Sequence, residues 1–472
     1  MAYSRDIHPA RIRLTGDRRT PRGRYVLYWM QQSQRAADNH ALEFAAQQAN
    51  ELGLPLVVGF GLTGRYPEAN LRHFRFMLEG LSDLRETLRG RGVRLAVRLG
   101  DPADVALDLG AKAAVIVCDR GYLRHQKRWR AKVAAGAPCP VFEVESDIVV
   151  PVRTASQKAE YAARTLRPKI ERLLDEYLVE LRPTPLEHES TGMRLAGVEI
   201  GGVDTTLARL DIDRSVPPVP IHRGGEAGAL RALERFVAGP LDGYAANRNR
   251  PERDYVSYLG MHLHFGQLSP VRAAMRVDRS DRGSADDRAA FLEELIIRRE
   301  LACNFAEYTA DYDRFSCLPD WARATLQRHA ADARSPRYTA ARLEAARTHD
   351  PYWNAAMREM RCSGYMHNYM RMYWGKKILE WSASPAYAYR VMLALNNRYF
   401  LDGRDPNSYA GVAWVFGMHD RPWSERDVFG TVRYMSAGGL ERKADPAAYV
   451  EKVDALEASI AASDRNTGNR GR

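Results

Sequence analysis

The sequence contains few cysteines and no long apolar run. Its five cysteines among 472 residues stand singly, without CxxC or other metal-ligand spacing, so we expect reduced, buried thiols and no structural disulfide. No run of about 18 apolar residues occurs, which argues against a membrane-spanning helix. The N-terminus also lacks the apolar segment of a signal peptide. We therefore expect a cytoplasmic protein without membrane attachment.

Two common nucleotide-binding motifs are also missing. No GxGxxG follows the first apolar run, and no GxxxxGK[ST] occurs anywhere. A dinucleotide held in a glycine-rich turn of an N-terminal sheet is therefore not expected. His262 and His264 lack a carboxylate at metal-ligand spacing, so we expect no metal site.

The chain is basic, with a formal net charge of +11 and a pI near 9.4. Such a balance fits a polyanionic partner. All but nine of the 70 basic residues are arginine, however, which equally fits the base composition of a genome. No block of like charge forms a basic tail, so a binding face has to be assembled by folding.

Short apolar runs alternate with helical patterns over residues 24–152. The runs that predict strands are 25–30, 56–62, 95–100, 113–118 and 141–150, and the helical patterns between them include 39–52, 71–88 and 102–109. This alternation predicts right-handed βαβ units and a five-stranded, mostly parallel, Rossmann-like sheet. The polar, Arg-rich residues 1–23 predict a disordered tail.

The remainder of the chain is predicted to be helical. Within residues 153–227, residues 153–184 are expected to form a charged amphipathic helix, strongest over 158–181, and residues 185–225 an interdomain linker containing Pro and Gly. From 228 to 462 the periodicity is helical throughout, which predicts a large all-α domain. Residues 463–472 are expected to be a disordered tail. No internal repeat is found.

The segment 351–424 carries five of the eight tryptophans. Trp374 and Trp381 lie seven residues apart, which on a helix is two turns along one face, roughly 10 Å. Polar residues that an apolar core would exclude are woven among them, namely Asn368, Arg371, Asn396, Asp402 and Asp405. The pattern suggests a buried cofactor with an electron path to the surface. A Trp-rich core with satisfied polar groups is the alternative.

Other segments give weaker signals. Tyr244, Arg248 and Ser257 precede glycines 260 and 266, an arrangement that suits a phosphate but also describes ordinary turns. Glu293 and Glu294 are adjacent, so they face different sides of a helix, and one can reach Arg298 or Arg299 in an ion pair. A pair between Arg371 and Asp402 would be a strong charge-assisted contact pointing to a site.

These segments together resemble the photolyase/cryptochrome flavoproteins, and specifically the class II cyclobutane pyrimidine dimer (CPD) photolyases. The resemblance runs from RYVLYWMQQSQRAADNHALEFA through EYAARTLRPKIERLL to GYMHNYMRMYWGKKILEW, LDGRDPNSYAGVAWVFG and the DRPW and GGLERK motifs. It covers nearly the whole chain. No single motif decides it, but their order and spacing make coincidence improbable.

The resemblance implies an all-helical domain that binds FAD. The cofactor-binding residues would be Tyr244, Arg248, Ser257, Asn368, Arg371, Asp402 and Asp405. Asn396 would lie near flavin N5 and favour the reduced form by hydrogen bonding. The cofactor then supplies the chemistry while the protein positions it.

The resemblance further implies that the substrate is UV-damaged DNA containing cyclobutane pyrimidine dimers. The lesion would be flipped into a pocket, as the handling of damaged bases requires, and photoexcited reduced FAD would donate an electron that splits it. Glu294 would stabilise the dimer radical anion as a protonated, buried carboxyl. Met372 and Trp414 would line the pocket, and Arg298 stands where photolyases often place an aromatic residue.

Three tryptophans match those that reduce resting flavin in this class: Trp374 next to the flavin, Trp353 between, and Trp381 at the exposed end. Arg442 and Lys443 would contact DNA, or are surface charges only. The N-terminal domain would hold an antenna pigment such as 8-hydroxy-5-deazaflavin. The protein is expected to act as a monomer, at the nucleoid if the source is bacterial.

Two other functions stay open. A cryptochrome-like blue-light receptor would bind FAD and signal through partner proteins, but such members usually carry long C-terminal extensions beyond the GGLERK region. Repair of the (6-4) photoproduct would call for a histidine at the pocket, and His367 and His419 are expected to fall outside the positions where that chemistry takes place. The favoured prediction is dimer repair by a deoxyribodipyrimidine photo-lyase.

Overall fold

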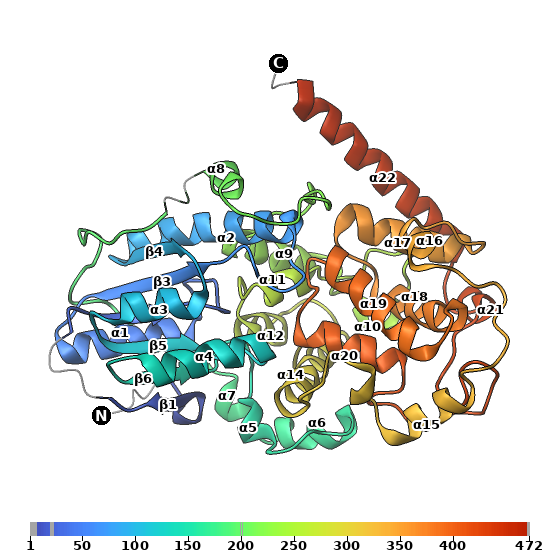
Figure 1. The fold of residues 1–472 in the computed structure, drawn as a ribbon, viewed down its shortest axis with the longest axis horizontal. Coiled ribbons are helices and arrows are strands. Elements are labelled where there is room, and N and C mark those ends of the chain that lie inside the picture. Colours follow the sequence, from blue (N-terminus) through green and yellow to red (C-terminus); the bar gives the residue numbers. More distant parts are fainter. Residues whose placement is uncertain (1–6, 19–22, 199, 201, 470–472) are drawn as a thin grey trace.

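The computed structural model describes residues 7–18, 23–198, 200 and 202–469. An α/β unit occupies one side of the molecule and a larger helical unit the other, and the short helices of residues 152–177 lie beneath them (Figure 1).

Six strands form a single sheet in the order β1-β6-β5-β2-β3-β4. The strands are β1 (Ile12–Gly16), β2 (Tyr25–Trp29), β3 (Leu56–Leu62), β4 (Arg94–Leu99), β5 (Ala113–Asp119) and β6 (Val141–Val144). All neighbours are parallel except β1 and β6. The five predicted parallel strands are confirmed, and an antiparallel edge strand is added to them.

Strand β1 lies in the segment predicted to be a disordered tail, and that prediction is wrong for the described residues. The strand pairs with β6 from Ile12 opposite Val144. Just before it, the buried guanidinium of Arg11 donates to the carbonyl oxygens of Glu145 and Ile148 at 3.1 and 3.0 Å. An edge strand leaves half of its residues exposed, so its composition does not differ from that of a tail. Residues 1–6 and 19–22 lie outside the described part.

Helices cover both faces of the sheet. The helices α1 (His40–Leu52) and α2 (Leu71–Gly90) pack with Val26 and Tyr28 on one face. On the other face α3 (Pro102–Gly110) and α4 (Arg124–Gly136) pack with Leu27 and Trp29. Because successive side chains point to opposite faces, strands buried on both sides are continuously apolar, which is why the sequence predicts them well.

The single helix predicted over residues 153–184 is wrong. The structure has three short helices there, α5 (Val152–Ala155), α6 (Ala163–Glu171) and α7 (Leu174–Tyr177), and α8 (Val203–Ala208) follows. The chain between α5 and α6 is held as a loop by Asn304, which accepts from the Glu160 N–H at 2.7 Å and donates to the Lys158 carbonyl at 2.9 Å. This tertiary contact outweighs the local helical pattern.

The rest of the described chain forms helices joined by loops, and no strand occurs in its residues after 144. They are α9 (Glu226–Ala238), α10 (Tyr244–Asn247), α11 (Gly260–His264), α12 (Pro270–Asp278), α13 (Ala285–Leu292), the π-helix η2 (Glu293–Arg298), α14 (Arg299–Tyr308), α15 (Asp320–Arg328), α16 (Ala340–Glu344), α17 (Pro351–Ser363), α18 (Asn368–Trp381), α19 (Pro385–Tyr399), α20 (Pro406–Val415), α21 (Ala437–Glu441) and α22 (Pro446–Asn469). Short 3₁₀ turns lie at Pro9–Arg11 and Phe315–Cys317.

The last helix, α22, corrects the predicted C-terminal tail. It continues to Asn469, so the expectation of disorder from residue 463 is wrong up to that residue. Its first turns pack on α17, where Arg358 pairs with Asp454 and Glu457, and it then projects from the helical unit (Figure 1). Within the described residues, the helices lack the combination of length and apolarity needed to cross a membrane.

Candidate functional site

Most of the predicted site residues line one cavity of about 390 Å³ in the helical unit, which we name the main cavity. Its walls come from η2, α14, α18, α19 and α20. The predicted residues that line it are Arg248, Glu294, Arg298, Asn368, Arg371, Met372, Trp374, Asn396 and Trp414. Residues far apart in the chain thus meet in one place.

An adjoining cavity of about 220 Å³ is lined by Tyr244, Ser257, Asp402 and Asp405. Glu294 and Asn407 line both cavities, so the two form parts of one binding region. Between them they contain every residue predicted to bind the cofactor. Burial raises the pKa of Tyr244 to about 12, which keeps its hydroxyl protonated in this region.

The π-helix η2 sets the direction of the two adjacent glutamates. Glu293 accepts from Arg167 at 2.7 Å and from Arg298 at 2.9 Å, outside the cavities. Glu294 faces the cavities, where its Oε1 accepts from Arg248 Nη2 at 2.8 Å. The expectation of a buried carboxyl at Glu294 is wrong, because its side chain is 33% exposed and is paired with a guanidinium. Single π-helical turns are frequent at functional sites.

Arg371 of the main cavity and Asp402 of the adjoining cavity form the expected pair. Nη2 of Arg371 donates to both carboxylate oxygens of Asp402 at 3.0 Å, and Nε donates to the Met366 carbonyl at 3.0 Å. The guanidinium lies 3.9 Å from the Phe400 ring centroid. Gly260 leaves room for the carboxylate, since a Cβ there would approach Asp402 Oδ2 to 2.9 Å. The Met366 carbonyl and the Phe400 ring therefore hold the pair in place, and Gly260 leaves room for it.

Asp405 caps α20 and stays ionised. Its carboxylate accepts from the Asn407 N–H at 2.8 Å and lies 3.3 Å from His264 Nδ1. Burial alone would raise the pKa of Asp405, but the contacts with His264, Arg299 and Asn407 outweigh it and hold the pKa below its ordinary value. A fixed negative charge therefore lines the adjoining cavity.

The three predicted electron-transfer tryptophans form a connected series. Trp374 lines the main cavity, and the indole N–H of Trp353 donates to the Trp374 carbonyl at 3.0 Å. The rings of Trp353 and Trp381 lie 5.7 Å apart between centroids. The expectation that Trp381 is the exposed end is wrong, because it is 2% exposed. The rings of Tyr338 and His349 cover it, at 5.4 and 5.2 Å.

Arg298 stacks beside Trp414 at the cavity wall. Its guanidinium carbon lies 5.5 Å from the Trp414 ring centroid. The contact with Glu293 holds it there. An arginine plane thus occupies the position where an aromatic wall was expected, and it supplies hydrogen-bond donors as well as a flat surface.

His419 is not among the predicted site residues, but the structure brings it to the site. It lines the main cavity, and its ring lies 5.5 Å from that of Trp414. His367, in contrast, does not line either cavity. The His419 side chain reaches the cavity through a turn after α20 that has no periodic pattern, so no local signal could have placed it.

A basic groove opens next to the main cavity. It contains Trp423, Arg426, Arg433, Tyr434, Arg442 and Lys443, and its described lining residues include no Asp or Glu. Arg433 lines both the groove and the main cavity. The guanidiniums of Arg426 and Arg433 lie over the rings of Tyr434 and Trp423, at 3.7 and 5.0 Å.

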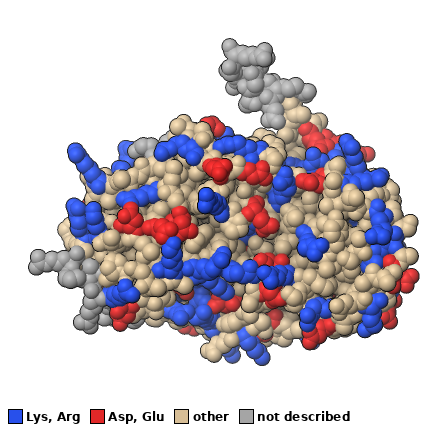
Figure 2. Space-filling model, in the orientation of Figure 1, with Lys and Arg blue, Asp and Glu red and all other residues tan. Residues whose placement is uncertain are grey.

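Sequence reasoning found Arg442 and Lys443 but missed the rest of this groove. The interleaving of arginine with aromatic residues over 421–434 was a usable signal, since such a pattern is typical of surfaces that contact nucleic acid. Figure 2 shows Lys and Arg interspersed with Asp and Glu on the face that it draws. Net charge alone therefore does not reveal a binding surface.

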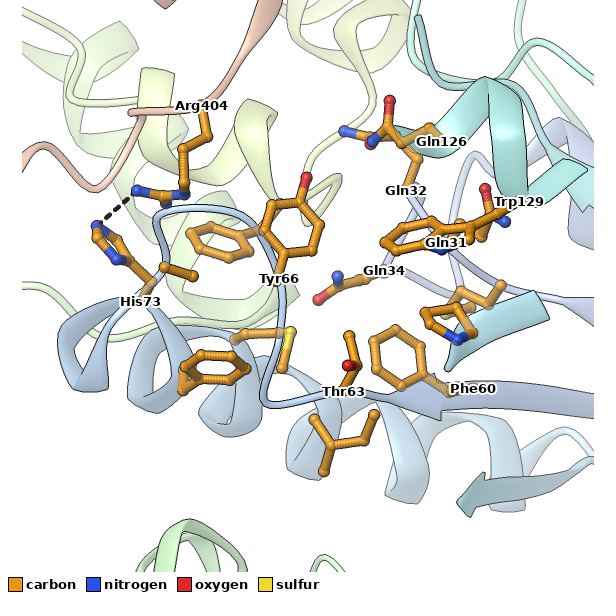
Figure 3. A pocket seen from close by; sticks show the side chains of 18 of the residues that line it. Gln31, Gln32, Gln34, Phe60, Thr63, Tyr66, His73, Gln126, Trp129 and Arg404 are labelled. Atoms are coloured by element: carbon orange, nitrogen blue, oxygen red, sulfur yellow. Dashed lines mark hydrogen bonds between the residues drawn. The ribbon is translucent and has the colours of Figure 1, made fainter. Parts of the chain in front are cut away.

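A separate cavity, which we name the N-terminal cavity, lies at the carboxyl ends of β2 and β3 (Figure 3). Phe60, Tyr66 and Trp129 supply rings, and Arg404 reaches in from the helical unit, where it contacts His73 at 2.9 Å. The amide groups of Gln31 and Gln34 line it, and both Gln31 side-chain atoms and Gln34 Oε1 are buried without a partner among the described residues. Such atoms suit a polar ligand. No sequence motif predicts these residues.

Asp119 occupies the position where a phosphate would sit in a nucleotide-binding sheet. Its Oδ2 accepts from the N–H groups of Gln31, Gln32 and Ser33 at 2.8–3.1 Å, and its Oδ1 accepts from the Tyr28 hydroxyl at 2.7 Å. A nest of backbone N–H groups is an anion site, and here the protein's own carboxylate fills it. This agrees with the missing glycine-rich motif. Among the described residues, no group of three or more His, Cys, Asp and Glu is arranged to hold a metal ion.

Comparison with known proteins gives consistent results. A family model described as DNA photolyase matches residues 26–188. The deoxyribodipyrimidine photo-lyase of Methanothermobacter thermautotrophicus is 48% identical over 95% of this chain and 99% of its own length. That of Potorous tridactylus is 38% identical over 90% of this chain and 81% of its own. The prediction of an enzyme of this kind is confirmed at the level of the family.

Solved structures show the same fold at low identity. A class III photolyase from Agrobacterium tumefaciens has a TM-score of 0.71 with 20% identity, covering 92% of this chain and 87% of that one. A photolyase from Sulfolobus tokodaii, solved with two FAD molecules, has a TM-score of 0.68 with 18% identity, covering 90% and 89%. A cryptochrome from Synechocystis has a TM-score of 0.71 with 18% identity, covering 90% and 87%. On the sequence relatives and this shared fold, the chain belongs to the DNA photolyase family.

Proposed function

We propose that this protein is a class II photolyase that uses reduced FAD and light to split cyclobutane pyrimidine dimers in DNA. The observation that carries the proposal is the main cavity itself. Trp374, the first of the three connected tryptophans, lines it on one wall, and Glu294 and Trp414 supply polar and stacking groups on another. The basic groove lies beside it. A cofactor there would lie between an electron path and a DNA-facing opening.

The residues of the two cavities fit FAD. Met392, Phe400 and Val415 supply apolar surface for a tricyclic ring in the main cavity, while Ser257 and Arg299 supply polar groups at the adjoining one. The indole N–H of Trp374 is buried without a partner among the described residues. Asn396 lines the main cavity, and its amide N–H donates to Asn397 Oδ1 at 3.0 Å. Its side-chain oxygen is not used in that bond, and we assign it the role at flavin N5. Reduced FAD, when bound and photoexcited, supplies the electron that opens the dimer.

The chain's own part in the reaction is to bind and orient the lesion and to keep it dry. Trp414 offers a stacking face and Met372 an apolar contact, while Arg298 closes the side next to Trp414. Glu294 is proposed to act on the pyrimidine carbonyls together with its partner Arg248, because the pair offers both an acceptor and guanidinium donors. This replaces the simpler picture of a lone protonated carboxyl.

DNA contact is proposed for the basic groove. Arg442 and Lys443 lie there beside Arg426 and Arg433, so a backbone approaching the main cavity would meet several cations at once. Exposed Trp423 adds a ring that can stack on an unpaired base. The protein is proposed to bind DNA as a monomer.

The N-terminal cavity is proposed to hold an antenna pigment such as 8-hydroxy-5-deazaflavin. The free amides of Gln31 and Gln34 offer donor and acceptor atoms that complement the N–H and C=O groups of a pyrimidinedione edge. The rings of Tyr66 and Trp129 would pack against a flat chromophore (Figure 3).

Repair of the (6-4) photoproduct is less well supported. It would call for a histidine that gives up a proton, whereas burial lowers the pKa of His419 to about 4 and leaves it neutral. A blue-light receptor is disfavoured by the names of the curated relatives.

The proposal is tested with an oligonucleotide pool carrying both dimers and (6-4) photoproducts, illuminated with the reduced protein and analysed by lesion-specific chromatography. Loss of the dimers alone is expected. Loss of the (6-4) product alone, or of neither lesion with FAD bound and reduced, would overturn the proposal in favour of one of the alternatives.

A further inference from the structure

His419 is held in an unusual backbone conformation next to the main cavity. Its φ of +59° lies in the left-handed region, which is uncommon for a residue other than glycine. The turn before it is closed by Met418 N–H donating to the Ala413 carbonyl and Gly417 N–H to the Trp414 carbonyl, both at 3.1 Å, as at many helix C-termini. Strained residues cluster at functional sites, so the side chain merits a chemical explanation.

The proton position on the His419 ring follows from its contact with Tyr161. Nδ1 lies 2.8 Å from the Tyr161 backbone carbonyl. A carbonyl oxygen only accepts, so Nδ1 carries the proton, and in the neutral ring Nε2 is left as an acceptor. The Tyr161 hydroxyl donates to the Asp420 carbonyl at 2.6 Å, which ties the same two segments together a second time. The tautomer is thus set by the fold.

The acceptor nitrogen has nothing to accept within the protein. Nε2 is buried and has no hydrogen-bond partner among the described residues, and the side chain that carries it is 8% exposed and lines the main cavity. The ring is fixed between Phe305 and Trp414, at 5.7 and 5.5 Å. A buried polar atom of this kind is costly unless a ligand satisfies it.

The neighbours of His419 define what that ligand presents. Arg298 lines the same cavity, with its guanidinium carbon 5.5 Å from the Trp414 ring centroid, and it carries guanidinium donors. An acceptor beside donors is complementary to an imide, in which an N–H donor stands between two carbonyl acceptors. Thymine and uracil carry such an N3–H, and saturation of the ring in a dimer leaves it in place. Cytosine has an unprotonated N3 and would face Nε2 with a second lone pair.

We infer that His419 determines base specificity by accepting a hydrogen bond from the imide N3–H of one pyrimidine of the flipped dimer. The inference rests on the proposed dimer-binding function and deepens it. It predicts that the protein distinguishes the two bases of a dimer and favours thymine or uracil over cytosine at the base that faces His419.

The experiment measures dark binding of three oligonucleotides, each carrying one thymine dimer: unmodified, N3-methylated on the 5′ base, or N3-methylated on the 3′ base. The flavin-loaded wild-type protein is compared with His419→Ala, with His419→Gln, whose amide oxygen can still accept, and with His188→Ala, an exposed histidine in a distant loop. Flavin absorbance of each variant reports the integrity of the main cavity.

Wild-type protein and His188→Ala are expected to lose about tenfold in affinity for one methylated dimer, the equivalent of one hydrogen bond. His419→Ala is expected to bind the unmodified dimer about tenfold more weakly than the wild type and to bind all three dimers equally. His419→Gln is expected to regain part of the affinity and part of the discrimination against the methylated dimer. Equal binding of all three dimers by the wild type would overturn the inference, whether or not the variants fold. Full discrimination by His419→Ala would overturn it too.

Failure of the proposed dimer-repair function can be told apart from failure of the inference about His419. A wild-type protein that neither binds the unmodified dimer in preference to undamaged DNA nor repairs it in light would sink both proposals. Repair without discrimination at N3 would sink the inference alone.

Discussion

The buried carboxyl of Glu300 makes the stability of this protein depend on pH. Glu300 is 2% exposed, on α14, and its Oε1 accepts from the Val149 N–H at 2.6 Å and from the Val150 N–H at 3.3 Å, so it joins the helical unit to the segment after β6. Burial raises its pKa from an ordinary value of 4.5 to about 8, although those N–H groups and Arg299 oppose the shift.

The sign and size of the effect follow from the difference between the pKa of Glu300 in the folded protein and its ordinary value in the unfolded chain. Between about pH 4.5 and 8 the folded protein keeps the proton on Glu300 and the unfolded chain loses it. Unfolding then releases a proton, so the free energy of unfolding falls as pH rises, by about 1.4 kcal/mol per pH unit and by about 4–5 kcal/mol over the window. Below the window both states are protonated, and above it both are ionised, so the slope disappears.

Substitution of Glu300 by Gln removes the titration while keeping an oxygen for the two N–H groups. The variant should match the wild type near pH 5 and exceed its unfolding free energy by about 4 kcal/mol at pH 8. Urea denaturation followed by circular dichroism and tryptophan fluorescence at pH 5, 6, 7 and 8 measures the difference. Because the two proteins share all other titrating groups, the difference isolates Glu300.

Glu307 on the same helix is the matched control. It pairs with Arg120 at 2.7 Å and with Arg153 at 2.8 Å, and despite its burial these partners hold its pKa below the ordinary value. Glu307→Gln should destabilise the protein by a constant amount over pH 5–8. A Glu300→Gln difference that does not change with pH would refute the reasoning.

Three further predictions concern other parts of the molecule. Trp353→Phe interrupts the path between Trp374 and Trp381, so it should stop the light-driven reduction of oxidised flavin, which is measured by absorbance under illumination. Chemically prereduced protein with this substitution should still repair dimers. Loss of repair as well would contradict a role for Trp353 in flavin reduction alone. Asp119→Ala removes the acceptor of three backbone N–H groups and of the Tyr28 hydroxyl, so it should lower the unfolding free energy by about 3 kcal/mol in urea melts. Asp119→Asn, which keeps an acceptor, should lower it less, and equal effects would argue against the nest. Arg442→Ala should reduce the slope of log affinity against log salt for dimer DNA by about 1, and an unchanged slope would remove Arg442 from the DNA interface.

The sequence predicts best what local pattern determines. The parallel strands are buried on both faces, so their apolar runs stand out, and their positions agree with the structure to within a residue or two except at the end of β6. Strand β1 escapes prediction because an edge strand with exposed Arg13 and Leu14 has the composition of a tail. The loop between α5 and α6 escapes because Asn304, far along the chain, holds it.

The site residues also divide into those that a local motif indicates and those whose environment distant contacts determine. The residues named from motif resemblance, such as Asn368 and Arg371, do come together around one cavity. Details set by distant partners could not be foreseen: Trp381 is buried because Tyr338 and His349 cover it, and Glu294 is paired because Arg248, at the end of α10, reaches it. His419 depends on a carbonyl more than 250 residues away in the chain.

The most direct test of the account is repair of one defined thymine dimer in an oligonucleotide by prereduced protein, in light and in darkness, with chromatographic measurement of restored thymine. The account predicts restored thymine under blue or near-ultraviolet light and none in the dark, with strong loss of the light reaction in Glu294→Ala. No restoration in light by protein that holds fully reduced FAD, or equal restoration in darkness, would contradict it.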